Sequence, residues 1–79
     1  MTYQMNYVKN LLELMNREEK TKMLSGSNLK DREVELLIRR FVNGDSLKEC
    51  AQYFNLEEDT INKKQLKAVK KLYSFLKSY

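Results

Sequence analysis

The stretch from Ser46 to Leu72, SLKECAQYFNLEEDTINKKQLKAVKKL, decides the fold because it holds two helix signals joined by a turn signal. Ser46 and Glu49 have the S-x-x-E spacing of a capping box, in which each side chain bonds the other residue's free backbone N–H. The sequence therefore predicts a short helix over about residues 47–54. The buried stripe of that helix repeats at helical spacing and consists of Leu47, Cys50, Ala51 and Phe54.

A tight turn is expected directly after this helix. Asn55 tolerates the left-handed backbone conformation that a tight turn needs, more readily than most residues other than glycine. We expect the next residue, Leu56, to be buried and so to anchor the turn.

A longer helix is predicted from about residue 58 to near the C-terminus. Glu57, Glu58 and Asp59 crowd its first turn, where negative charge interacts favourably with the helix dipole. Two apolar stripes run side by side along it. The first, expected to be buried, contains Ile61, Ala68, Leu72 and Phe75, and the second contains Leu66, Val69, Tyr73 and Leu76.

Two helices joined by the turn at Asn55–Glu57 are typical of a helix-turn-helix. The small residue Ala51 lies where the second helix must cross the first closely. In such a motif the first helix braces the second, and the outer face of the second can enter the major groove of DNA. An ordinary three-helix bundle with the same spacing is the alternative.

The remaining chain also has helical periodicity. A helix is expected over residues 3–24, with a break or frayed segment within Asn16–Thr21, and a loop over residues 25–28. A helix over about residues 30–43 should end at Gly44 in a left-handed cap. The apolar face of the first helix contains Val8, Leu11, Leu12 and Met15, widened by Tyr7, Leu14, Met23 and Leu24, and that of the second contains Val34, Leu37, Ile38, Phe41 and Val42.

These elements predict an all-α fold of about four helices with a C-terminal helix-turn-helix. Seventy-nine residues suffice for one domain, residues 1–79. Within it, residues 1–24 form an N-terminal helical extension, 25–28 the loop and 29–79 the helix-turn-helix part.

The residue inventory argues against an enzyme. The chain contains no histidine and one cysteine, which excludes an internal disulfide and the Cys-His and Ser-His nucleophile pairs. We expect no metal site, cofactor or small-molecule substrate, and we expect Cys50 to be a small core residue. No apolar run approaches the roughly 20 residues that span a bilayer, and residues 1–24 lack the order of a signal peptide. The expected location is the cytoplasm, without a membrane partner.

Charge is distributed unevenly along the chain. Residues 1–59 contain nine basic and eleven acidic residues, whereas residues 60–79 contain six lysines and no acid. A positive end on a near-neutral body is typical of a nucleic-acid footprint, and equally of a solvated lysine-rich helix.

Residues Leu29–Leu72 resemble region 4 of the sigma-70 family and, slightly less closely, the LuxR-type output domains. The resemblance lies in REVELLIRRF at Arg32–Phe41 and in the stretch Ser46–Leu72 quoted above, above all in K-E-x-A at Lys48–Ala51 and A-V-K-K-L at Ala68–Leu72. It covers 44 of 79 residues. Because sigma regions 2 and 3 are absent, the chain is similar to a free-standing region-4-like protein of the kind common in phages and mobile elements.

The resemblance implies a site on the helix at about residues 58–72. Region 4 reads promoter DNA with this helix and touches RNA polymerase. The chain departs from the family in its three acids at residues 57–59, where family members often carry arginine. The positions that the resemblance aligns with base contacts are Glu58, Asp59, Asn62 and Lys63, those suited to phosphates are Lys67 and Lys70, and those suited to other backbone contacts are Thr60 and Lys48.

Two functions follow as expectations. The first is a DNA-binding transcription regulator whose partners are double-stranded DNA and RNA polymerase. The second is an interaction module with a region-4-like fold that binds polymerase, a sigma factor or itself as a homodimer, without strong DNA binding. Leu66 and Tyr73 distinguish the two, because apolar side chains on the flank of the helix need cover. That cover is either the N-terminal helix or a partner protein.

Overall fold

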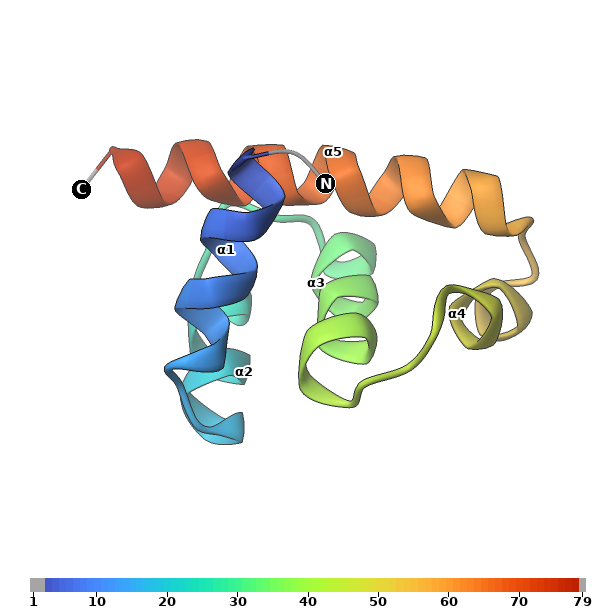
Figure 1. Ribbon diagram of the computed structural model, residues 1–79, viewed down its shortest axis with the longest axis horizontal. Helices are drawn as coiled ribbons and strands as arrows, with labels where there is room; N and C mark the ends of the chain where they lie inside the picture. Colours follow the sequence, from blue (N-terminus) through green and yellow to red (C-terminus); the bar gives the residue numbers. More distant parts are fainter. Residues whose placement is uncertain (1–2, 79) are drawn as a thin grey trace.

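The computed structural model describes residues 3–78, and the regular secondary structure of that part is entirely helical. The longest helix, α5, runs along one edge of the molecule, while α1, α2 and α3 cross beneath it and α4 lies under its start (Figure 1). The all-α class is confirmed, with five α-helices instead of about four. In chain order the elements are α1 (Tyr3–Glu13), α2 (Arg17–Ser25), α3 (Asp31–Leu37), the π-helical turn η1 (Ile38–Val42), α4 (Leu47–Phe54) and α5 (Glu58–Lys77).

The additional helix arises because the chain breaks between α1 and α2. The Asn16 side chain accepts a hydrogen bond from the Glu19 N–H at 2.8 Å, and Glu19 accepts one from the Asn16 N–H at 3.0 Å. This reciprocal cap begins α2 at Arg17. The expected break therefore occurs, but it spans residues 14–16 and overlaps the predicted segment only at Asn16, because the rest of that polar segment is helical. Leu14, expected on the apolar face, is 85% exposed because it lies in the turn before the cap.

The segment expected as one helix over residues 30–43 is helical throughout, but its second half is π-helical. Asn43 donates its N–H to the carbonyl of Ile38 at 2.9 Å, which is the i→i+5 bond of a π-turn. The chain then leaves through Gly44, whose φ of +78° is the left-handed conformation expected there. The extra residue in the turn carries no sequence signal that periodicity could have detected.

The turn between α4 and α5 forms as the sequence predicts. Ser46 and Glu49 make the capping box, with bonds of 2.9 and 3.1 Å, and Asn55 has φ 57° and ψ 49°. The expected burial of Leu56 was wrong: its side chain is 41% exposed. The turn is held by backbone bonding, in which the Leu56 N–H donates to the Ala51 carbonyl at 2.9 Å, so it does not depend on a buried leucine.

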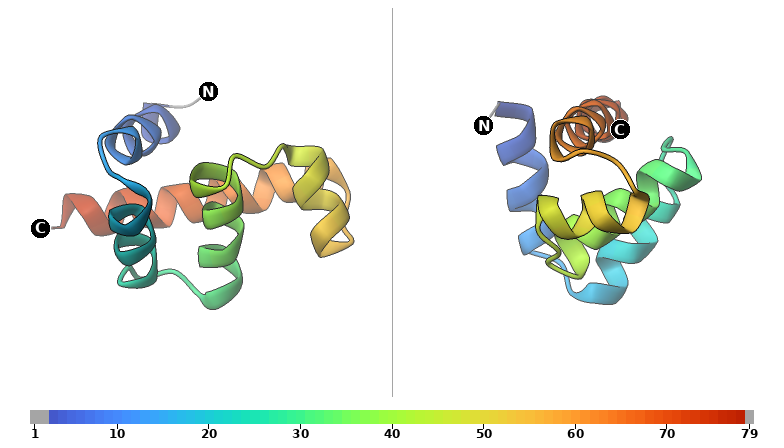
Figure 2. Two further views of the ribbon diagram at one scale, coloured as in Figure 1. Left: turned by 90° about the horizontal axis from the view of Figure 1, so that it is seen from below. Right: turned by 90° about the vertical axis from the view of Figure 1, so that its right-hand side faces the viewer.

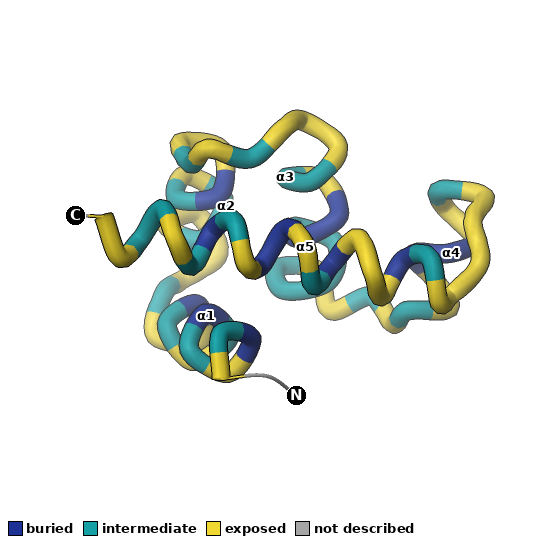
Figure 3. The backbone as a smooth tube through the Cα atoms, turned by 90° about the horizontal axis from the view of Figure 1, so that it is seen from above, coloured by how far each residue is buried: buried dark blue, intermediate teal, exposed yellow. Residues whose placement is uncertain are grey.

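Two apolar clusters form the core, and α5 contributes to both. The smaller cluster contains the expected Cys50 and Ala51 of α4, together with Leu36 and Ile61. Buried and exposed residues alternate along α5 as it passes over the other helices (Figure 3). The larger cluster contains Met5, Val8, Leu12, Leu24, Leu37, Ala68, Val69 and Leu72.

The second stripe of α5 is covered by α1. Leu66 and Tyr73 are half-buried against the larger cluster, and the Tyr73 ring meets the Tyr7 ring edge-on at 5.2 Å between centroids. These two side chains therefore pack against the N-terminal helix, as one of the two alternatives predicted. Among the helices of residues 3–78, none is long and apolar enough to cross a lipid bilayer.

Candidate nucleic-acid interface

The outer face of α5 is basic. Residues on the inner side, such as Ile61, Ala68 and Leu72, are buried, so the 3.6-residue period turns Lys63, Lys67 and Lys70 to the opposite side. All three lysines are exposed. Viewed along its axis, α5 has α1 beside it and its outer side uncovered (Figure 2).

The other predicted site residues fall around this line of lysines. Glu58 and Asp59 are exposed in the first turn of α5, whereas Thr60 is half-buried. Asn62 is exposed but lies toward α1, where it lines an open groove that also contains Leu66. Lys48 is exposed on a different helix, in the first turn of α4. The structure thus brings Lys63, Lys67 and Lys70 together, and sets Asn62 and Lys48 to the side.

Two of the six lysines of α5 are engaged within the protein. Lys71 forms an ion pair with Glu33 of α3 at 2.8 Å. The Lys77 ammonium lies 5.1 Å from the centroid of the Tyr7 ring and 5.8 Å from that of Tyr73. Both of these lysines therefore hold α5 to its neighbours and are less available to an external anion.

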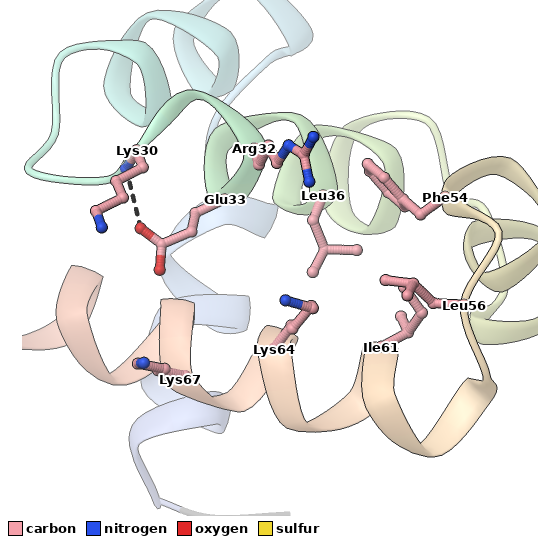
Figure 4. Close-up of a pocket in the computed structure, with 9 residues that line it drawn as sticks. All are labelled: Lys30, Arg32, Glu33, Leu36, Phe54, Leu56, Ile61, Lys64 and Lys67. Carbon is pink, nitrogen blue, oxygen red and sulfur yellow. Dashed lines mark hydrogen bonds between the residues drawn. The ribbon is translucent and has the colours of Figure 1, made fainter.

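The basic surface continues from α5 onto the start of α3. There a pocket of about 360 Å³ separates the two helices. Lys64 and Lys67 line it from α5, and Lys30, the N-cap residue of α3, and Arg32 of α3 line it from the other side (Figure 4). Its apolar lining consists of Leu36, Phe54, Leu56 and Ile61.

Sequence reasoning missed Lys30, Arg32 and Lys64 as parts of one surface. Lys64 is more than 30 residues along the chain from Lys30 and Arg32, and nothing in the REVELLIRRF stretch that begins at Arg32 indicates a surface shared with Lys64. Only the packing of α3 against α5 brings them together. The available signal was the position of Lys64, one residue from Lys63, inside the basic segment.

A partly buried polar network fixes α5 to the segment before α4. Arg40 of η1 donates from Nε to the Gln65 side-chain oxygen and from Nη1 to the Asp45 carbonyl at 2.7 Å. Its neighbour Arg39 pairs with the Asp45 carboxylate at 3.0 Å and lies 3.2 Å from the centroid of the Tyr53 ring on α4. These contacts join η1, α4 and α5, and so determine how α4 supports the exposed helix.

The Glu33–Lys71 pair makes the attachment of α5 sensitive to acid. Burial alone raises the pKa of Glu33, but the hydrogen bonds from Lys71 and the Lys30 N–H, with the charges of both lysines, outweigh it and lower the pKa below 4.5. Because the folded pKa is depressed, the pair's contribution is complete above the ordinary glutamate value and is lost as pH falls below it.

We expect Glu33→Gln to be less stable than the native chain at pH 7, and this difference to shrink below about pH 4.5. Urea unfolding at a series of pH values, followed by circular dichroism, measures it. Glu35→Gln, an exposed change on the same helix, is the matched control and should leave stability unchanged. A difference that stays constant down to about pH 3 would show that the ion pair contributes nothing.

The remaining candidate for chemistry is Cys50. Its thiol is fully buried, as expected for a core residue, and burial raises its pKa. The described residues include no group of three His, Cys, Asp or Glu side chains placed to hold a metal ion. The exposed lysine and arginine side chains of α5 and the start of α3 can bind anions.

This surface can bind a polyanion through several cations carried on a rigid helix. The acids at residues 57–59 make the start of α5 negative, whereas the lysines further along the helix make its outer face positive. Comparisons with models of protein families, with curated proteins and with solved structures find no match for this chain.

Proposed function

We propose that this protein is a DNA-binding transcription regulator, in which α4 and α5 act as a helix-turn-helix. The outer face of α5 enters the major groove, and α4 braces it from behind. The observation that carries the proposal is the line of Lys63, Lys67 and Lys70, exposed together on the outer side of α5, which no other element covers. Within residues 3–78 none of these lysines has an ion-pair partner.

The division of roles along α5 follows from its geometry. Lys63 lies in the second turn, where the helix reaches base edges, and lysine pairs with guanine. Lys67 and Lys70 lie one and two turns further on and meet phosphates. Glu58 and Asp59 in the first turn accept from cytosine N4, which favours cytosine and repels phosphates. The protein then binds random DNA weakly and gains affinity at a matching site.

The resemblance to sigma region 4 supports the same assignment for α5. It also adds RNA polymerase as a proposed partner of the regulator. The alternative of an interaction module built on Leu66 and Tyr73 gains no support, because both side chains pack against the core cluster that α1 helps to form.

Titration of labelled duplex DNA, followed by fluorescence anisotropy, tests the proposal. We expect a dissociation constant of about 10⁻⁴ to 10⁻⁶ M for mixed sequence, rising steeply between about 50 and 200 mM salt. Lys63→Glu/Lys67→Glu should weaken binding about tenfold or more and reduce the salt slope by about two, since each phosphate or base-edge cation contributes about one.

The matched control is Arg17→Glu/Lys22→Glu, which makes the same change of charge on exposed residues of α2. It should weaken binding far less, because α2 lies away from the outer face of α5 (Figure 1). If both double variants weakened DNA binding equally, the loss would reflect the net charge of the protein and not a site on α5. Absence of binding at low salt would overturn the proposal.

A further inference from the structure

The pocket between α3 and α5 has an apolar lining that is partly open to water. Leu36 on α3 and Ile61 on α5 are buried and point toward each other across it (Figure 4). Phe54 is half-buried beside them, whereas Leu56, at 41% exposure, stands at the open side. The volume of about 360 Å³ is near the lower end of the range for small-molecule sites, about 300–1,000 Å³. The pocket therefore has the size and the lining for a compact apolar group.

Cations surround this lining without ion-pair partners. Arg32 on α3 and Lys64 and Lys67 on α5 line the pocket and are exposed, and none of the three forms an ion pair within residues 3–78. Lys30 lines the pocket too, but its charge acts on Glu33. Three positive charges therefore remain at the pocket for an external anion.

The acids near the pocket do not neutralise these three cations. Glu33 lines the pocket, but its carboxylate pairs with the Lys71 ammonium at 2.8 Å and accepts the Lys30 backbone N–H at 2.9 Å. The other acids of α3, and those at residues 57–59, are exposed and are not among the residues that line the pocket. An anion in the pocket would therefore meet an excess of positive charge.

We propose that this pocket binds a small anionic amphiphile, a molecule with a carboxylate at one end of a short hydrocarbon body. The hydrocarbon body lies on Leu36, Leu56 and Ile61. The carboxylate pairs with Arg32 and Lys64 at the rim, where the planar guanidinium of arginine offers two parallel N–H donors that match the two carboxylate oxygens.

Both halves of the ligand are required by the chemistry of the pocket. A bare anion would neutralise the cations but leave the exposed part of the apolar lining in water. A neutral apolar molecule would cover that lining but gain nothing from the three unpaired cations. A molecule that carries both groups removes apolar surface from water and forms charge-assisted hydrogen bonds at the same time.

Titration of the full chain with sodium octanoate, followed by amide proton–nitrogen NMR spectra, tests the site. We expect saturable shifts of the amides in residues 30–36 and 56–67. The dissociation constant should be on the order of 1 mM, because so small a ligand contributes few contacts. Acetate has the charge without the chain, and octanol has the chain without the charge. Each should bind about tenfold more weakly than octanoate, or weaker still.

Two variants separate the charged and apolar parts of the site. Arg32→Gln/Lys64→Gln removes two cations and should weaken octanoate binding about tenfold, while leaving octanol binding unchanged. Leu56→Ser removes an apolar contact and should weaken octanoate and octanol alike, by about threefold or more. All three positions are exposed, so the fold should persist, and the same spectra verify it.

The control is Lys70→Gln, an exposed lysine of α5 outside the pocket, which should bind octanoate like the native chain. The inference fails if octanoate causes no saturable shifts at the pocket, or if acetate or octanol binds as tightly as octanoate. It also fails if Arg32→Gln/Lys64→Gln binds octanoate like the native chain. None of these measurements involves DNA, so the inference and the proposed function stand or fall separately.

Discussion

Val8→Asp should destabilise the domain by about 4 kcal/mol or more, the largest effect that we expect from one substitution. Val8 is fully buried in the larger cluster, between α1 and the rest of the core. The change removes a buried apolar side chain, worth about 1.5 to 3 kcal/mol, and forces a carboxylate either to lie unpaired in the core or to accept a proton. A domain of this size has a total stability of about 4 to 12 kcal/mol.

Urea unfolding followed by circular dichroism measures the effect. We expect a single transition at a much lower midpoint, because α1 shares its cluster with α2, η1 and α5 and cannot leave alone. The matched control is Asn10→Asp, the same gain of charge at an exposed position of α1, which should stay within about 0.5 kcal/mol.

An unchanged midpoint for Val8→Asp would contradict the packing of α1 on α5. Leu66 and Tyr73 would then be open to solvent or to a partner. The experiment therefore also tests whether the second apolar stripe of α5 packs against α1 or is left for a partner protein.

Signals confined to three or four neighbouring residues predicted local structure well. The Ser46–Glu49 box, the left-handed Asn55 and the left-handed Gly44 all form as expected. Each depends on hydrogen bonds or backbone sterics within one turn, so distant residues hardly affect it. The bounds of α4 follow directly from two of them.

Features that depend on packing were predicted less well. The Asn16–Glu19 box is an N-x-x-E pattern, but it stands inside a stretch with helical periodicity, and that periodicity concealed the start of α2. Leu56 was expected to be buried because it is apolar, whereas its exposure depends on the distance between α3 and α5.

The candidate site shows the same limit. Lys63, Lys67 and Lys70 share a face of one helix, and helical periodicity alone places them together. Lys30 and Arg32 join them only because α3 packs against α5, a contact between segments distant in sequence. Likewise, no pattern indicated that Arg40 would bond Gln65, 25 residues away.

Arg40→Leu should destabilise the domain by roughly 2–3 kcal/mol, a large effect for a residue outside the apolar core. Gln65 is 4% exposed on α5, and the Arg40 Nε–H is the donor to its side-chain oxygen. Removing the donor leaves that oxygen buried without its partner, which costs about 1–3 kcal/mol. The Asp45 carbonyl loses its bond to Nη1 as well.

The double variant Arg40→Leu/Gln65→Leu should recover part of this loss, because an apolar pair leaves no buried oxygen unsatisfied. Urea unfolding of the two single variants and the double variant gives the coupling free energy between the two residues. We expect about 1 kcal/mol or more, as is usual for groups in contact. If the losses simply add, the two side chains act independently, and the hydrogen bond does not hold α5 against η1. Arg39→Leu breaks the neighbouring pair with Asp45 but leaves Gln65 satisfied, so it should cost less than Arg40→Leu. That order reflects the physical difference between the two arginines, since only Arg40 bonds a buried side chain of the helix that carries the candidate site.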